Sequence, residues 1–158
     1  MSIGEIYLTP EGHDKLIEEL DYLEKTKRRE IAKALEYARS LGDISENAEY
    51  DAAKNEQAHC EKKIAGLKDK LSRARIIDPK QMPDGQVFIG AKVLLKDLDT
   101  DEELKYMLVS QEEADYEAGK ISIESPVGKS LLQRKVNDIV EINVPAGTLR
   151  YKITKISR

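Results

Sequence analysis

Apolar residues in the first half of the chain recur at steps of three and four, the spacing of helices that bury one narrow stripe. The first stripe lies in residues 10–41 and runs through Leu16, Leu20, Leu23, Ile31, Ala34, Ala38 and Leu41. The second lies in residues 48–78 and runs through Ala48, Ala52, Cys60, Ile64, Leu67, Leu71 and Ala74. Two matching stripes joined by a few residues predict an antiparallel helical hairpin. Because neither stripe is wide enough to pack beneath a sheet as well, we expect the hairpin to project into solvent.

Individual residues mark where the two predicted helices begin, shift register and end. Thr9 and Pro10 mark the start of the first, because threonine caps helices and proline suits the first helical position. Lys27 interrupts the first stripe, and the two four-residue steps around it predict a local adjustment of register. The second helix is expected to end near Asp78, which precedes a proline.

From Val87 onward the pattern alternates between apolar and polar residues, which is typical of strands. We expect strands over 87–95, 103–109, 121–123, 138–144 and 148–156, and a short helix over 125–132 that Ser125 caps. The predicted fold class is therefore α+β. An antiparallel coiled-coil hairpin occupies residues 1–79 with its tip at 41–50, and an antiparallel β domain with a short helix occupies 80–158.

Composition narrows the function classes. There is no Trp and one Phe, which argues against a base-stacking platform, and the net charge of −4 does not favour DNA binding over the whole surface. The single cysteine, Cys60, excludes an internal disulfide and a multi-cysteine zinc site, and it fits the apolar stripe. No signal peptide and no apolar run of roughly 20 residues is present, so we expect a cytoplasmic protein without membrane contact, and a monomer.

The segment LGDISENAEYDAA, residues 41–53, carries four acids and no base at the predicted tip. Asp43 and Glu46 are three residues apart, the spacing of a capping box, in which the two side chains satisfy backbone N–H groups at a helix start. The alternative is metal chemistry. Mg²⁺ takes six oxygen ligands, so two exposed carboxylates make half a site and a partner must supply the rest.

Basic residues precede the acidic tip: residues 25–39 hold six bases and two acids. A solvated helix face explains them, and contact with nucleic acid or another anion is the alternative. The candidate contacts are Arg29, Lys33, Arg39 and, just past the tip, Lys54. Tyr50 is suited either to stack on a base or to cover the end of the hairpin.

The segment LGDISENAEYDAAKNEQ closely resembles the tip signature of bacterial Gre-type transcript cleavage factors, in particular the GreA branch. The resemblance continues in LTPEGHDKLIEELDYL, RARIID, VFIGAKV, ISIESP and VPAGTLRYKI, in the family's order. Gln133 and Asn137 stand where glycines are expected. The resemblance implies that residues 80–158 form an FKBP-like domain that docks on RNA polymerase.

The resemblance also implies a mechanism. The hairpin enters the secondary channel of a backtracked bacterial RNA polymerase, near the 3′ end of the nascent RNA and the other nucleic acid of the elongation complex. There Asp43 and Glu46 help hold a second Mg²⁺ that is shared with the polymerase, and the polymerase cleaves its own RNA. Asn47 and Tyr50 match the family's supporting tip residues. The chain is then an accessory factor, not an enzyme.

Two alternatives remain open. One is a free-standing enzyme, either a metal nuclease or a prolyl isomerase built on residues 80–158, whose only aromatic residues are Phe88, Tyr106, Tyr116 and Tyr151. The other is an inhibitory relative that blocks the channel without stimulating cleavage, against which the intact pair of Asp43 and Glu46 argues.

Overall fold

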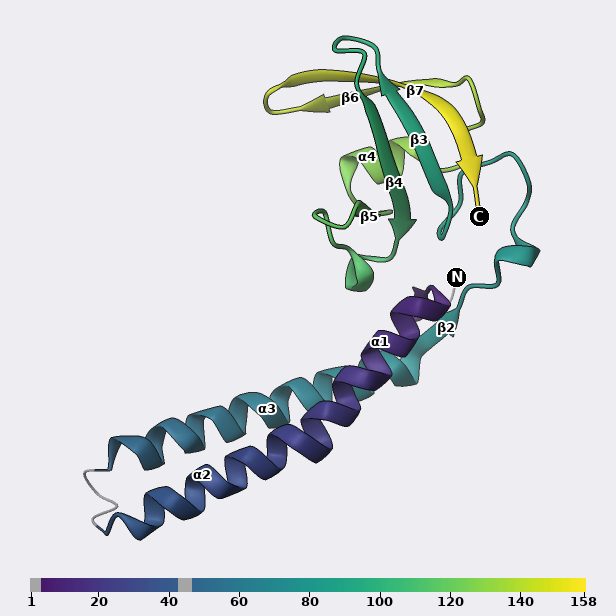
Figure 1. Ribbon diagram of the computed structural model, residues 1–158. Coiled ribbons are helices and arrows are strands. Elements are labelled where there is room, and N and C mark those ends of the chain that lie inside the picture. The colour runs from purple at the N-terminus through teal and green to yellow at the C-terminus, as the bar shows by residue number, and fades with distance from the viewer. Residues whose placement is uncertain (1–3, 43–46) are drawn as a thin grey trace. The chain divides into compact units, whose positions relative to one another are not determined.

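The computed structural model describes residues 4–42 and 47–158, which divide into two compact units (Figure 1). The hairpin unit is His13–Arg73, and the sheet unit joins the segment that ends at Gly12 to Ala74–Arg158. This division differs from the predicted boundary between residues 79 and 80. The difference arises because β1 (Ile6–Leu8) pairs in parallel with β2 (Ala74–Ile76).

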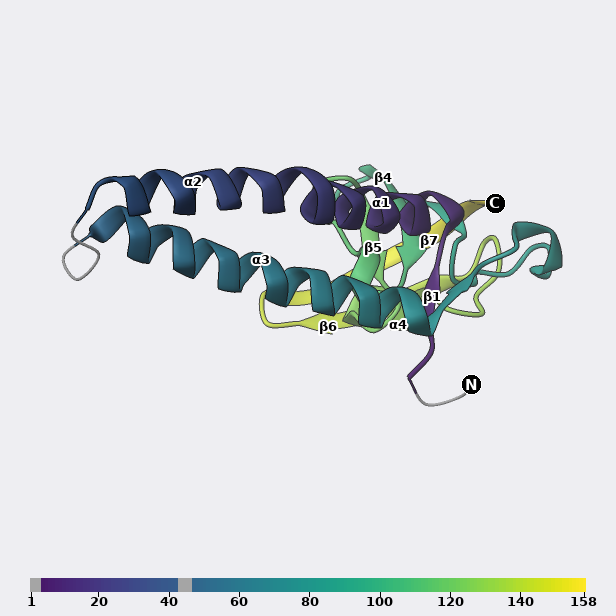
Figure 2. The same ribbon diagram turned by 90° about the horizontal axis from the view of Figure 1, so that it is seen from below.

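The hairpin is made of two long arms that lie side by side in both Figure 1 and Figure 2. The first arm consists of α1 (Pro10–Asp21), a π-helical segment η1 (Tyr22–Lys27) and α2 (Arg28–Ser40), and the second is α3 (Ala48–Arg73). The 26 residues of α3 correspond to ~39 Å of helix. The predicted antiparallel hairpin is confirmed. Among the described helices, none has the length and apolarity needed to span a membrane.

A single apolar seam holds the arms together, and its buried members are Leu23, Ile31, Leu35, Ala53, Cys60, Ile64 and Leu67. Ala38 is buried as well. Two predicted members were wrong by one residue: Leu35 is buried instead of Ala34, and Ala53 instead of Ala52. Both differences follow from the seven-residue spacing at which buried positions recur when two helices pack along each other. Leu35 lies four residues after Ile31, and Ala53 lies one full repeat before Cys60. Two further predicted members, Leu41 and Ala48, are exposed.

The predicted register adjustment takes the form of the π-helix η1. Leu23 and Ile31 are eight residues apart, one more than the repeat allows, and a π turn accommodates one extra residue. The N–H of Arg28 donates to the carbonyl oxygen of Leu23, which closes the wider turn. Cys60 packs opposite this turn, with its Sγ 3.9 Å from the same oxygen.

Two elements near the base of the hairpin were not predicted. The second helix ends at Arg73, short of the predicted Asp78, because the next three residues form β2. Residues 1–8 carry no clear strand pattern, yet β1 buries Ile6 and Leu8. Pairing between segments about 70 residues apart leaves no local signal in the sequence.

The sheet unit contains a five-stranded sheet in the order β5-β4-β3-β7-β6 (Figure 1). Its strands are β3 (Lys92–Asp97), β4 (Glu103–Val109), β5 (Lys120–Ser122), β6 (Ile139–Val144) and β7 (Gly147–Ser157). The expectation of an all-antiparallel sheet was wrong, because β5 pairs in parallel with β4. Short 3₁₀ turns, η3 (Pro79–Gln81) and η4 (Gln111–Glu113), lie in the connections.

One face of this sheet forms the core of the unit. Val93, Leu95, Leu108 and Ile153 are buried there together with Leu131 of α4 (Pro126–Leu131). The predicted cap of α4 is confirmed, since the Ser125 side chain accepts a hydrogen bond from the N–H of Gly128.

Two positions where glycines were expected adopt the left-handed conformation that favours glycine. Gln133 has φ 66° and Asn137 has φ 73°. Both residues therefore hold a left-handed backbone conformation without being glycine, which costs some backbone strain at Gln133.

The first turn of α1 is fixed by side chains. Thr9 is its cap, as predicted, because its Oγ1 accepts a hydrogen bond of 3.0 Å from the N–H of Gly12. The carboxylate of Glu113 in η4 accepts hydrogen bonds from both the N–H and the hydroxyl of Thr9. A methyl group at Gly12 would overlap that carboxylate, so glycine makes this approach possible.

Candidate functional site at the hairpin tip

Asn47 forms the start of α3 and ties it to the other arm. Its Oδ1 accepts hydrogen bonds of 3.1 Å from the N–H groups of both Glu49 and Tyr50, which is the geometry of a helix cap. Its Nδ2 donates to the carbonyl oxygen of Ala38, near the end of α2. Asn47 is 9% exposed, so these bonds are shielded from water. One side chain therefore both begins α3 and bridges the two arms.

This finding changes the interpretation of the tip acids. Asp43 and Glu46 lie outside the described residues, and in the sequence they fall between Leu41, the C-cap of α2, and Asn47. The cap of α3 is Asn47, so the first turn of α3 does not depend on Asp43 for a cap. The sequence carried a signal for this: Asn47 directly precedes Ala48, and two acids follow within one turn.

Tyr50 covers the end of the seam. It is half-buried and packs against the apolar cluster between α2 and α3. The Nζ of Lys54 lies 6.0 Å from the centre of its ring and 3.4 Å from Oε1 of Gln57. Of the two interpretations made from the sequence, this packing agrees with a tyrosine that closes the hairpin. Lys54 itself is exposed one turn beyond Tyr50.

The six basic residues at positions 25–39 fall into two groups. Lys25, Lys27 and Arg28 form ion pairs with Asp21, Glu56 and Glu61 respectively. The hydrogen bond from Arg28 lowers the pKa of Glu61, and the hydrogen bond to Glu56 raises the pKa of Lys27. These three bases therefore form ion pairs within the hairpin unit.

Arg29, Lys33 and Arg39 form the second group. All three are exposed, and none has an ion-pair partner within residues 4–42 and 47–158. Arg29 and Lys33 are one turn apart and share a face of α2, whereas Arg39 lies roughly 120° around the helix from Lys33. The four candidate contacts therefore do not form one continuous patch.

Other side chains considered in the sequence do not form a second site. His59 is exposed and Cys60 is buried in the seam. In the part of the chain that the structure describes, no three His, Cys, Asp or Glu side chains gather as metal ligands. Tyr151 is buried in the core, Tyr106 packs against that core and Tyr116 is exposed. The sheet unit therefore does not gather these tyrosines into one aromatic pocket.

Comparison with known proteins gives a consistent result over nearly the whole chain. A family model described as "Transcription elongation factor, N-terminal" matches residues 6–76, and one described as "Transcription elongation factor, GreA/GreB, C-term" matches residues 82–158. The chain is 52% identical over 150 residues to transcription elongation factor GreA of Chloroherpeton thalassium, covering 95% of each protein. It is 49% identical to GreA of Chlorobium phaeobacteroides, covering 96% of each.

Solved structures are also similar. GreA factor homolog 1 of Thermus thermophilus is 31% identical, with 98% of this chain and 99% of that chain covered and a TM-score of 0.42. The GreA/GreB elongation factor of Nitrosomonas europaea is 22% identical, with 98% of each chain covered and a TM-score of 0.44.

Proposed function

Because this chain belongs to the GreA/GreB family of transcription elongation factors, we propose that it stimulates a bacterial RNA polymerase to cleave backtracked nascent RNA. In this proposal the hairpin unit enters the secondary channel of the polymerase and residues 80–158 dock on its surface. Cleavage creates a new RNA 3′ end at the polymerase active site, so that an arrested complex resumes synthesis.

One observation supports this proposal beyond the family match. The sequence places Asp43 and Glu46 between the end of α2 and Asn47, which caps α3 and bridges the arms. Because Asn47 supplies the cap, the two acids are not needed for the start of α3. They are available for chemistry at the end of two long helices.

The chemistry of the tip acids suits a shared Mg²⁺ ion. Carboxylate oxygens are the ligands that Mg²⁺ prefers, and two carboxylates supply fewer than the six oxygen atoms that it needs. Asp43 and Glu46 would therefore hold the ion from one side, and the polymerase would supply the remaining ligands. When bound, such an ion activates water and stabilises the charge of the cleaved phosphate.

The roles of the other tip residues follow from their contacts. Asn47 and Tyr50 position the tip, because one joins the arms and the other closes the seam. Lys54, Arg29, Lys33 and Arg39 are exposed cations that are able to pair with the RNA or with another anion in the channel. The chain acts in this proposal as an accessory factor, and the polymerase performs the reaction.

The test uses Asp43→Asn and Glu46→Gln in a stalled, backtracked elongation complex, with Glu49→Gln as the control. Asn47 caps α3, so we expect neither tip variant to change the free energy of unfolding by more than about 0.5 kcal/mol. Each should still bind polymerase, while RNA cleavage falls by at least ~10-fold, about 1.4 kcal/mol of barrier. Glu49 is exposed in the first turn of α3, and its variant should cleave like the parent.

Three outcomes would contradict the proposal. An Asp43→Asn variant that stimulates cleavage like the parent would remove the acids from the mechanism. A parent protein that binds polymerase but blocks cleavage would be an inhibitor of the channel. A parent protein that cleaves RNA without polymerase, or that binds Mg²⁺ tightly in calorimetry, would be a free-standing nuclease.

A further inference from the structure

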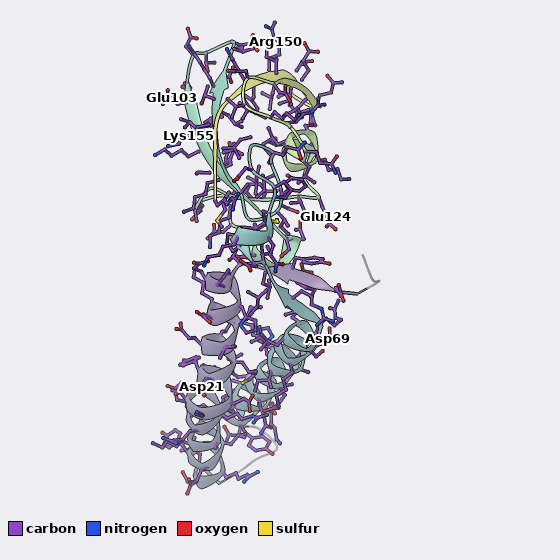
Figure 3. All side chains as sticks on the ribbon, turned by 90° about the vertical axis from the view of Figure 1, so that its right-hand side faces the viewer. Asp21, Asp69, Glu103, Glu124, Arg150 and Lys155 are labelled. Carbon is purple, nitrogen blue, oxygen red and sulfur yellow. The ribbon has the colours of Figure 1, made fainter. Side chains whose placement is uncertain are left out.

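The sheet unit contains a cavity of about 440 Å³ that the proposed function does not use. Residues 77–91, which connect β2 to β3, supply one part of its lining. The end of the sheet supplies another part, because strand pairing places four lining residues in one row: Lys120, Met107, Lys92 and Ser157. In Figure 3, Lys155 of β7 projects outward from the unit, so the next residue, Ile156, points to the other side of the strand, and it lines the cavity as well. The cavity therefore lies where the end of the sheet meets the connection from β2.

Apolar side chains that neither core uses line this cavity. Met82, Phe88, Ile89 and Met107 are half-buried there, and none of the four belongs to either apolar core of the described residues. Phe88 is the only phenylalanine of the chain, and a phenylalanine contributes most to stability when a core buries it. A concave, mostly apolar site of about 300–1,000 Å³ is the usual form of a small-molecule site, and this cavity falls within that range.

Backbone hydrogen bonds fix the part of the lining that Phe88 and Ile89 form. The N–H of Ala91 donates to the carbonyl oxygen of Phe88 at 3.0 Å, which closes a tight turn. The N–H of Gly90 donates to the carbonyl oxygen of Leu108 in β4 at 2.6 Å, and its φ of 90° is a conformation that favours glycine. Because the turn is already held against the sheet, a ligand would bind there without the cost of ordering it.

The charged residues of the lining leave one cation without a partner. Arg158 forms an ion pair with Asp84, and Lys120 is half-buried near an acid outside the lining, 3.9 Å from it. Glu11 is the other acid of the lining and is exposed. Lys92 is exposed, and within the described ranges 4–42 and 47–158 it has no ion-pair partner. Lys92 is therefore available to an anion that enters the cavity.

The apolar lining suits an aromatic ring in particular. Rings pack favourably on another ring, here Phe88, and on the sulfur atoms of methionines, here Met82 and Met107. Lys92 is paired with Met107 across β3 and β4, so its side chain extends beside one of these contacts. An acyl chain would have no ring with which to use them.

We propose that this cavity binds a small aromatic carboxylate or sulfonate, with the ring on Phe88 and Met107 and the anionic group at Lys92. The site is separate from the tip acids in sequence and in chemistry, and the inference does not depend on the proposed function. A bound ligand would contact both residues 77–91 and the end of the sheet, so it would stabilise the folded sheet unit.

The test measures the binding of 8-anilinonaphthalene-1-sulfonate to the full-length protein by fluorescence titration. We expect saturable binding of one molecule with a Kd of roughly 10–100 µM, which is the affinity that a typical ligand efficiency gives for a molecule of this size. Lys92→Gln should weaken it by about 3- to 5-fold, the range of an exposed ion pair. Lys129→Gln is the control, because Lys129 is exposed in α4 outside the cavity, and it should bind like the parent. The neutral analogue N-phenyl-1-naphthylamine should bind the parent and Lys92→Gln equally.

Two further measurements locate the ligand. Phe88→Leu keeps an apolar side chain but removes the ring, so it should weaken binding of the sulfonate by about 3- to 10-fold. If that variant fails to fold, amide chemical shifts of the parent protein give the same information. On addition of the sulfonate they should change most at Ile89, Gly90 and Met107, and not at Cys60 or Ile64 in the hairpin seam.

Four results would overturn the inference. The first is no saturable binding below about 1 mM, and the second is shift changes confined to the hairpin seam. The third is equal binding of the sulfonate by the parent and Lys92→Gln, because the cation would then take no part. The fourth is tighter binding of decanoate than of the sulfonate, because the site would then favour an acyl chain. None of these measurements involves polymerase or RNA, so each result leaves the proposed function to its own test.

Discussion

Replacing Asn47 with alanine should loosen the end of the hairpin by an amount that its contacts define. The change removes the cap of α3, which typically contributes about 1 kcal/mol. It also removes the hydrogen bond from Nδ2 to the carbonyl oxygen of Ala38, worth about 1 kcal/mol net. That oxygen keeps a second partner, the N–H of Leu41 at 3.3 Å, so it is not left unsatisfied. We therefore expect a total loss of about 2 kcal/mol.

Asn47→Ser separates the two contributions. The serine hydroxyl still caps α3, but its shorter side chain carries no amide donor for Ala38, so only about 1 kcal/mol of the free energy of unfolding should be lost. Amide hydrogen exchange at Glu49 and Tyr50 is the direct measurement, since it reports local opening of this turn. Exchange should accelerate by roughly 30-fold in Asn47→Ala and by about 5-fold in Asn47→Ser.

Far-ultraviolet circular dichroism during urea unfolding provides the global measurement, because the long helices dominate that signal. The reasoning would be refuted if Asn47→Ala exchanged and unfolded like the parent. It would also be refuted if Asn47→Ser lost as much stability as Asn47→Ala, since the cap would then contribute nothing.

Three further changes test other parts of the fold. Gly12→Ala should lower the free energy of unfolding by about 1–2 kcal/mol, because the new methyl group displaces the Glu113 carboxylate from its two hydrogen bonds. In a Glu113→Ala background the same change should stabilise instead, since alanine favours helix, and a destabilising result there would contradict the explanation. Gln133→Gly should raise the free energy of unfolding by about 0.5–1 kcal/mol by relieving its positive φ, as measured by thermal unfolding. The pKa of Glu61 is lowered in the folded state by its hydrogen bond from Arg28, so the stability from this pair is present above the unfolded pKa of about 4.3 and is lost as the pH falls below it. Glu61→Gln should therefore weaken the loss of stability between about pH 5 and 3, and identical pH profiles would show that the pair contributes nothing.

Much of the fold is encoded in short-range pattern. The spacing of apolar residues predicted both arms of the hairpin, and the break at Lys27 predicted the place where the π-helix lies. Ser125 and Thr9 were recognisable as caps because a cap and its partner are only three residues apart. The tip signature in residues 41–53 is enough to indicate the family, since its residues are adjacent in the sequence and need no fold to bring them together.

Other features depend on contacts between distant residues, which leave no local sign in the sequence. The burial of Leu35 rather than Ala34 follows from the register of one helix against the other. The pairing of β1 with β2 brings together segments about 70 residues apart. Strand pairing likewise places Lys105 of β4 and Lys155 of β7 on either side of Leu94 in β3.

Asn47 takes part in one contact that the local sequence indicates and in another that only the packing of the two arms creates. Its position ahead of α3 carried a local capping signal, but its bond to Ala38 depends on how the two arms meet. Periodicity and capping are set by neighbours in the chain, so the sequence alone determines them. Strand register and contacts between arms are set by the packing of whole elements, and only the tertiary structure decides which side chains they bring together.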